Sequence, residues 1–195
     1  MAIHVVLDHS ALIPCGSKPE EEKIAIHRLG DILPSTDIVW YVSAEYLKTV
    51  ATVCIREWRN HHPLPKLQSS LHRIANSLAR IVRRSRSIVC NNLRLAEDYH
   101  IKMHVVARTA LNSVDSKTKN AIDELRERYE LWDEDVELLA IAVLSHGYVS
   151  KYGVELHVVT ADSRLENALN ELRDRMKLRI VTERPSTFLI HVESS

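Results

Sequence analysis

Short apolar runs that each stop at a polar residue constrain the fold of this chain more than any other feature. Ile3 to Leu7 (IHVVL) is rich in β-branched residues and meets Asp8 directly, and Ile38 to Val42 (IVWYV) is followed by Ser43. Such runs predict strands that are buried on both faces, as in a parallel sheet. We expect further strands at residues 156–160 and 178–181, and a fifth at residues 188–192.

The intervals between these runs show helical spacing, because apolar residues recur at steps of three and four. Residues 103–107 fit either a helix or a strand. Alternation of strands and helices predicts a parallel sheet that is covered on both faces. The expected fold is therefore α/β: a three-layer α/β/α arrangement around a central, mostly parallel sheet of four to five strands. The expected helices cover residues 20–33, 44–59, 66–86, 116–129 and 163–176, with a long helix that starts near Asp133 and ends or kinks at Gly147.

Length and composition fit one globular domain that carries an insertion. The chain has 195 residues, of which 45% are hydrophobic and 27% charged, as in ordinary globular proteins. Its three cysteines form no CxxC pair, so we expect a reducing, cytoplasmic setting. No stretch approaches the roughly 18–20 uninterrupted apolar residues of a membrane-spanning helix, so we expect no membrane partner.

The charge of the chain is unevenly distributed although its net value is zero. From Arg56 to Arg108 there are eleven Lys and Arg residues against three acidic ones, a net charge of +8, so the rest carries −8. We therefore divide the chain into a core at residues 1–60 and 130–195 and a basic helical insertion at residues 61–129. Such a basic insertion is suited to bind the phosphates of a nucleic acid. The expected contacts are Arg73, Arg80, Arg83 and Arg84, which gather on or beside one face of the helix expected at residues 66–86.

Four carboxylates fall where the predicted elements begin or end. Asp8 and Asp162 follow strands, whereas Glu45 and Asp135 lie in the first turns of helices. Ligands of open parallel sheets bind outside the carboxyl ends of the strands, so these side chains are expected to converge there. Clustered carboxylates repel one another unless a cation is bound, and hard oxygen ligands favour Mg²⁺ or Mn²⁺. Such a site predicts metal-dependent hydrolysis of phosphodiesters.

The same residues resemble the motifs of PIN-domain nucleases. "HVVLDHSALI" is similar to the first motif of that family, "SAEYLKTV" to the second, "WDEDVELLAIAV" to the third and "VVTADSRLENAL" to the fourth. The resemblance covers about residues 1–60 and 130–195. It implies metal ligation and catalysis by Asp8, Glu45, Asp135 and Asp162, with Ser10 and Thr160 as supporting polar groups. Asp133 and Glu134 remain alternatives to Asp135.

The resemblance implies an endoribonuclease, and the basic insertion favours a role in RNA processing. Compact PIN toxins of toxin–antitoxin pairs usually lack so large an insertion; a toxin would require an antitoxin-like partner. A PIN-like scaffold that binds RNA without cutting it is a further alternative. Tyr41, Tyr46 and Trp58 are candidates for base stacking, and the amphipathic helices of the insertion are candidates for a homodimer or a higher homo-oligomer.

Several points stay open at the level of the sequence. No residue distinguishes RNA from DNA, and the number of metal ions is not fixed. A doubly wound nucleotide-binding protein is disfavoured, because the chain has neither GxGxxG nor GxxxxGK[ST] and only four glycines.

Overall fold

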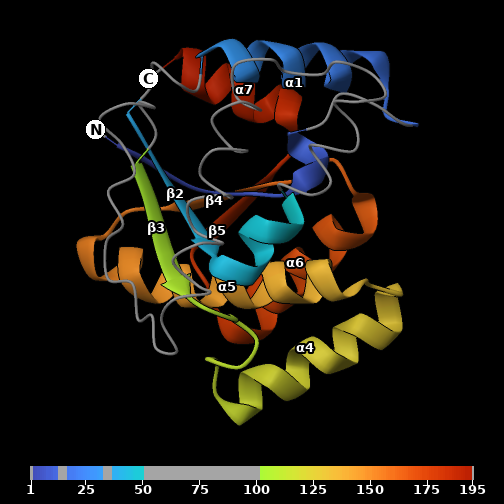
Figure 1. Ribbon diagram of the computed structural model, residues 1–195, viewed down its shortest axis with the longest axis vertical. Helices are drawn as coiled ribbons and strands as arrows, with labels where there is room; N and C mark the ends of the chain where they lie inside the picture. The colour runs from blue at the N-terminus through green and yellow to red at the C-terminus, as the bar shows by residue number, and fades with distance from the viewer. Residues whose placement is uncertain (1, 13–16, 33–36, 51–101, 195) are drawn as a thin grey trace.

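The computed structural model describes residues 2–12, 17–32, 37–50 and 102–194. Their centre is a five-stranded sheet with the order β3-β2-β1-β4-β5 (Figure 1). Every neighbouring pair of strands in this sheet is parallel. The strands are β1 (Ile3–Leu7), β2 (Ile38–Ser43), β3 (Lys102–Ala107), β4 (Leu156–Val159) and β5 (Ile180–Glu183).

Helices cover the two faces of the sheet and complete a three-layer α/β/α fold (Figure 1). α1 and α7 pack together over one face, whereas α4, α5 and α6 lie on the other. A short 3-10 helix, η1 (His9–Ala11), follows β1, and residues 44–50 are helical directly after β2. The longer helices are α1 (Glu20–Ile32), α4 (Ser116–Tyr129), α5 (Asp133–Val149), α6 (Ser163–Met176) and α7 (Pro185–Glu193), and a second 3-10 helix, η3 (Ser150–Tyr152), follows α5.

The core of the molecule lies on both sides of β1 and β4, two inner strands of the sheet. All four residues of β4 are buried, as are Val5, Val6 and Leu7 of β1. α5 is apolar on nearly all sides and is buried from Val136 to Ala142. A helix of this kind needs cover all round, which the sheet provides on one side and α4 and α6 on the other. The ends of β1 and β4 and the start of α5 are therefore held firmly by packing.

The predicted fold class is confirmed, and several helices are confirmed to within one residue of their expected ends. Residues 103–107, which the sequence left open, belong to strand β3. β3 pairs with β2, and α4 packs on α5 and α6. Thus residues 102–129, although expected in the insertion, contribute a strand and a helix to the same layers as the core.

Two details of the sequence prediction are wrong. The fifth strand expected at residues 188–192 is part of helix α7, where Phe188 and Val192 are buried but Ile190 is 67% exposed. Phe188 and Val192 are four residues apart and so fit either period; the exposure of Ile190 fits the helix only. Pro185 at the first position of α7 favours the helix further. The second error concerns the end of the long helix, because α5 does not end at Gly147 but continues through it to Val149.

The helix expected at residues 66–86, with Arg73, Arg80, Arg83 and Arg84, lies outside the described residues. The same holds for Trp58 and for the continuation of the helix that starts at Ala44. Among the residues that the structure describes, no helix has both the length and the apolar character needed to cross a membrane.

Candidate active site

Asp8 is the most deeply buried carboxylate at the C-terminal edge of the sheet. It directly follows β1 and is 1% exposed. Three hydroxyl groups donate hydrogen bonds to it: those of Tyr46 at 2.9 Å, Thr160 at 2.9 Å and Ser10. A buried carboxylate is tolerated when its oxygens are hydrogen-bonded, so these donors explain why a charge can remain at this position.

The hydrogen bonds and one neighbouring imidazole keep Asp8 ionised. Burial by itself raises the pKa of Asp8, but the nearby His9 and the hydroxyls of Ser10 and Thr160 outweigh burial and hold this pKa well below its usual range. His9 Nδ1 lies 3.0 Å from Asp8 Oδ1. Burial lowers the pKa of His9, yet the charge of Asp8 raises it on balance. An anionic Asp8 is therefore the state that this surrounding favours.

Ser10 and Thr160 tie the loop after β1 to the loop after β4. The backbone N–H of Ala161 donates to Ser10 Oγ at 2.8 Å, and that of Asp162 donates to Thr160 Oγ1 at 3.0 Å. Both hydroxyls also donate to Asp8, so each of them links the carboxylate of Asp8 to the backbone beside Asp162. The two residues are thus placed in the supporting positions that the sequence predicts for them.

Asp162 is the N-cap of α6. Its Oδ1 accepts hydrogen bonds from the backbone N–H groups of Arg164 at 2.8 Å and Leu165 at 3.4 Å. Capping satisfies the free N–H groups of the first turn and favours negative charge there. About 30% of the side chain is exposed. Its second oxygen, Oδ2, is 3.4 Å from a guanidinium nitrogen of Arg164.

Asp135 approaches the same edge from the start of α5. It is 4% exposed, and its Oδ2 accepts a hydrogen bond from the backbone N–H of Trp132 at 2.9 Å. Burial raises the pKa of Asp135 to about 6, assisted by the negative charges of Asp8 and Asp162 and opposed by the Trp132 hydrogen bond. Electrostatic coupling falls steeply with distance. The structure therefore brings together Asp8, Asp135 and Asp162.

Glu45 stands apart from these three carboxylates. It is about 39% exposed, and its Oε1 lies 2.7 Å from Lys48 Nζ and 3.8 Å from Arg108 Nε. It lines an open groove of about 340 Å³ between the start of α5 and the segment after β3. Its neighbour in the chain, Tyr46, reaches Asp8 directly through its hydroxyl. Ligation of metal by Glu45 therefore stays a prediction.

The two acidic alternatives to Asp135 differ from it in their surroundings. Asp133 is about 85% exposed and pairs with Arg126 at 2.6 Å. Glu134 lines the groove with Glu45 and is near enough to His9 to raise its pKa. Asp133 is thus exposed and Glu134 half-buried, whereas Asp135 is buried.

Sequence reasoning missed Glu137, a buried carboxylate within the third motif, two positions after Asp135. Its Oε1 accepts a hydrogen bond from Ser43 Oγ at 2.6 Å, and its Oε2 accepts from the backbone N–H of Leu111 at 3.0 Å. Ser43 Oγ in turn accepts from the N–H of Tyr46 at 3.1 Å and so caps the helix after β2, as predicted. A glutamate within an apolar helical run was the available signal for Glu137. Its contacts fix the ends of β2 and β3 beside the groove.

Tyr46 was also misassigned, because the sequence suggested it as a base-stacking residue. It is 2% exposed, and Tyr41, the second such candidate, is 5% exposed. The Tyr46 hydroxyl accepts from the N–H of His9 at 3.1 Å and donates to Asp8. Both tyrosines are therefore core residues, and Tyr46 belongs to the support of Asp8. Trp132, at the start of α5, is the exposed aromatic residue at this edge, with 64% of its surface accessible.

The donor set at this edge suits a hard divalent cation better than a transition metal. Asp8, Asp135 and Asp162 offer only oxygen atoms, as Mg²⁺ and Mn²⁺ prefer. Burial and, to a smaller extent, the charges of Asp8 and Asp162 raise the pKa of Asp135, and a bound cation would favour its ionised form. Their ligand atoms are not as compact as those of the group His157, Glu183 and His191, the single set in the described part of the chain with all ligand atoms within 4.8 Å of one another. Water or phosphate oxygens between carboxylate and metal fit this wider spacing.

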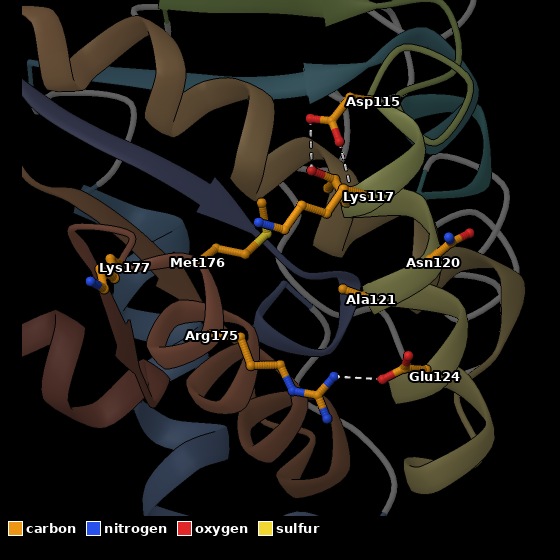
Figure 2. Close-up of a pocket in the computed structure, with 9 residues that line it drawn as sticks. Asp115, Lys117, Asn120, Ala121, Glu124, Arg175, Met176 and Lys177 are labelled. Atoms are coloured by element: carbon orange, nitrogen blue, oxygen red, sulfur yellow. Dashed lines mark hydrogen bonds and ion pairs between the residues drawn. The ribbon is translucent and has the colours of Figure 1, made fainter.

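A larger pocket, of about 920 Å³, lies far from these carboxylates, between α4 and the C-terminal end of α6 (Figure 2). Asp162 caps the opposite end of α6, about 20 Å away for a helix of this length. In the pocket Arg175 pairs with Glu124 at 2.7 Å and also contacts Glu171. The pocket is thus remote from the carboxylate cluster and has a mixed charge.

Comparison with models of protein families, with curated proteins and with solved structures finds no match for this chain.

Proposed function

We propose that this chain is a divalent-metal-dependent endoribonuclease of the PIN type, with Asp8, Asp135 and Asp162 as its central carboxylates. One observation carries the proposal: three carboxylates from three separate elements lie at one edge of a parallel sheet, where burial, together with the negative charges of Asp8 and Asp162, raises the pKa of Asp135 to about 6. Such an arrangement destabilises the fold unless the site has a use for a cation. Mg²⁺ or Mn²⁺ held there would polarise a water molecule as the nucleophile and stabilise the leaving oxygen.

The residues of the chain have distinct roles in this proposal. Asp8 is kept anionic by its hydroxyl donors. Ser10 and Thr160 fix the position of Asp8 relative to the backbone of Asp162. Asp135 is the carboxylate whose protonation responds to pH near neutrality. Burial of Asp8 and Asp135 lowers the local dielectric and strengthens their attraction for a cation.

The surface around the carboxylates offers contacts for single-stranded RNA. Trp132 presents an exposed indole at the start of α5, and bases stack on such side chains with little regard to sequence. Lys48 and Arg108 form ion pairs with Glu45 beside the groove and supply positive charge there. The choice of RNA as substrate comes from the PIN resemblance, whereas the net charge of +8 between residues 56 and 108 suits the phosphates of any nucleic acid.

Cleavage of labelled single-stranded RNA, structured RNA and matched DNA, with Mg²⁺, Mn²⁺ or EDTA, tests the proposal. The variant is Asp162→Asn, because asparagine caps a helix as well as aspartate does and the fold is retained. We expect cleavage that needs metal and is lost in Asp162→Asn. The matched control is Asp133→Asn, which makes the same chemical change at an exposed acid in the first turn of α5 and should cut as wild type does.

Absence of metal-dependent cutting on every substrate, with RNA binding retained and unchanged in Asp162→Asn, would contradict a nuclease and indicate a scaffold. Cutting that survives Asp162→Asn and EDTA would exclude the carboxylates as the catalytic centre. Preference for DNA over RNA would correct the substrate and leave the mechanism intact.

A further inference from the structure

A second group of metal-ligating side chains lies between the sheet and α7, away from the carboxylate edge. It comprises His157 in β4, Glu183 at the end of β5 and His191 in α7. His157 is three residues before Thr160, or about 10 Å along the strand. None of the three belongs to the motifs that suggest the nuclease.

The geometry of this group is already close to that of a coordination shell. One ligand atom from each residue lies within 4.8 Å of the other two. His157 Nδ1 is 2.9 Å from Glu183 Oε2, and the rings of His157 and His191 have centroids 4.5 Å apart. Two ligands of a tetrahedral zinc ion with bonds of roughly 2.0–2.1 Å are about 3.3 Å apart. Small side-chain adjustments would therefore admit an ion.

The surroundings of the group differ from those of a surface ion pair. His157 is 6% exposed, and the side chain of Glu183 is about 10% exposed. The ring of Phe188 lies 5.9 Å from that of His157 and forms an apolar wall. His191 is exposed and gives the group access to solvent. An ion held by the buried His157 and Glu183 and by the exposed His191 would therefore be open to solvent on the side of His191.

We propose that His157, Glu183 and His191 form a zinc site with three protein ligands and an open fourth position. Two imidazoles and a carboxylate are a ligand set that zinc accepts with an open site, and imidazole nitrogens select transition metals over Mg²⁺. Binding requires neutral imidazoles and an ionised glutamate, so it releases protons and weakens in acid. This site is separate from the nuclease proposal and does not depend on it.

An ion bound at this site would link helix α7 to the sheet. α7 is otherwise joined to α1, where buried Glu22 accepts hydrogen bonds from the N–H and Oγ of Ser186 at 3.0 and 2.7 Å. Those bonds hold the N-terminal end of α7, whereas His191 lies in its last turn. An ion shared by His191 and two strands would therefore stabilise the end of α7 that Glu22 does not reach.

Zinc titration of the full, tag-free chain tests the site, with bound metal measured by calorimetry and elemental analysis. We expect one equivalent on wild type and a rise in Tm with zinc. His191→Ala should weaken zinc binding by more than the ~10–100-fold that loss of an outer-sphere partner costs, and should abolish the rise in Tm. The matched control is His27→Ala, an exposed histidine of α1, which should bind zinc as wild type does.

The visible spectrum of Co²⁺, used in place of zinc, reports the ligands independently of stability. Wild type and Asp162→Asn should both show tetrahedral Co²⁺ bands that His191→Ala and Glu183→Gln lack. Equal zinc binding by wild type and His191→Ala, or no zinc binding by a folded wild type, would overturn the proposal. Zinc binding lost in Asp162→Asn but kept in His191→Ala would place the ion at the carboxylate edge and also overturn it.

Discussion

The carboxylate edge (Asp8, Asp135 and Asp162) and the histidine cluster (His157, Glu183 and His191) arrange metal-ligating groups in opposite ways. In the histidine cluster, His157 and Glu183 lie 2.9 Å apart, so that one partner can neutralise the other. At the carboxylate edge each aspartate is held by its own backbone or hydroxyl donors. The charges there have the same sign, and they add to the effect of burial in raising the pKa of Asp135.

Under the two proposals, the two arrangements suit different kinds of metal ion. Separate anchoring keeps three oxygens apart and ready for a hydrated, hard cation with substrate phosphate in its shell. A compact set with two imidazoles suits a dehydrated transition metal. The two regions are therefore expected to respond differently to substitution, to pH and to the choice of ion.

The largest expected effect is on folding and concerns Asp8→Ala. Removal of the carboxylate leaves the buried hydroxyls of Ser10, Thr160 and Tyr46 without their acceptor. We expect a loss of about 3–5 kcal/mol in the free energy of unfolding, measured by urea denaturation. Asp8→Asn, which keeps an acceptor, should lose less. Equal stability of Asp8→Ala and wild type would show that the hydroxyl network does not support the edge.

A smaller effect on stability is expected for Asp135→Asn, which should stabilise the fold in the absence of metal. Because the pKa of Asp135 in the folded state, about 6, lies above its ordinary value, the folded chain binds this proton more tightly than the unfolded chain. Stability is therefore lost as the pH rises through about 6. At pH 7.5 in EDTA the asparagine variant should be more stable by on the order of 2 kcal/mol, or about 4–8 °C in Tm.

The same comparison at low pH provides the control for Asp135→Asn. Near pH 4 the aspartate is protonated in the folded state, so the two proteins should have nearly equal Tm. A gain in Tm that does not change between pH 4 and pH 7.5 would mean that charge repulsion is not its cause.

Trp132→Ala should affect substrate binding and leave metal binding unchanged. The indole is 64% exposed, and loss of a base–aromatic stack costs about 1–3 kcal/mol. We expect RNA affinity to fall by that amount in fluorescence anisotropy, at fixed salt. Tyr152→Ala, at an aromatic side chain that is 81% exposed beyond the opposite end of α5, is the matched control. An equal loss of affinity in both variants would refute a specific role for Trp132.

The smallest effect is expected for Glu45→Gln, which tests whether the fourth predicted carboxylate belongs to the edge. Glu45 is half-exposed and paired with Lys48, and such pairs contribute less than about 1 kcal/mol. We expect Mn²⁺ affinity to change much less than in Asp162→Asn. A loss as large as that of Asp162→Asn would restore Glu45 as a ligand.

Much of the fold follows from local signals in the sequence. Buried strands of a parallel sheet appear as uninterrupted apolar runs, and Ser43 and Asp162, which follow two of these runs, cap the next helices. The run at residues 188–192 was wrongly predicted as a strand, because the spacing of Phe188 and Val192 fits the two-residue period of a strand as well as one turn of a helix. The exposure of Ile190 decides between them, and exposure is a tertiary property.

The carboxylate edge could be anticipated because its members follow strand ends or begin helices, and parallel strands bring such positions together. Glu137 and Tyr46 could not, since their roles depend on contacts across elements. The histidine cluster is harder still to foresee. Its residues share no motif, and His191 meets His157 only because α7 is a helix that packs on β4 and β5.

Mn²⁺ binding, followed by electron paramagnetic resonance, tests the central claim most directly. Wild type, Asp162→Asn and His191→Ala should be titrated side by side without nucleic acid. The account predicts that Mn²⁺ binds to wild type and to His191→Ala with equal affinity and that Asp162→Asn loses this binding while staying folded. Unchanged Mn²⁺ binding in Asp162→Asn, or no binding to folded wild type, would contradict a metal centre at the carboxylate edge.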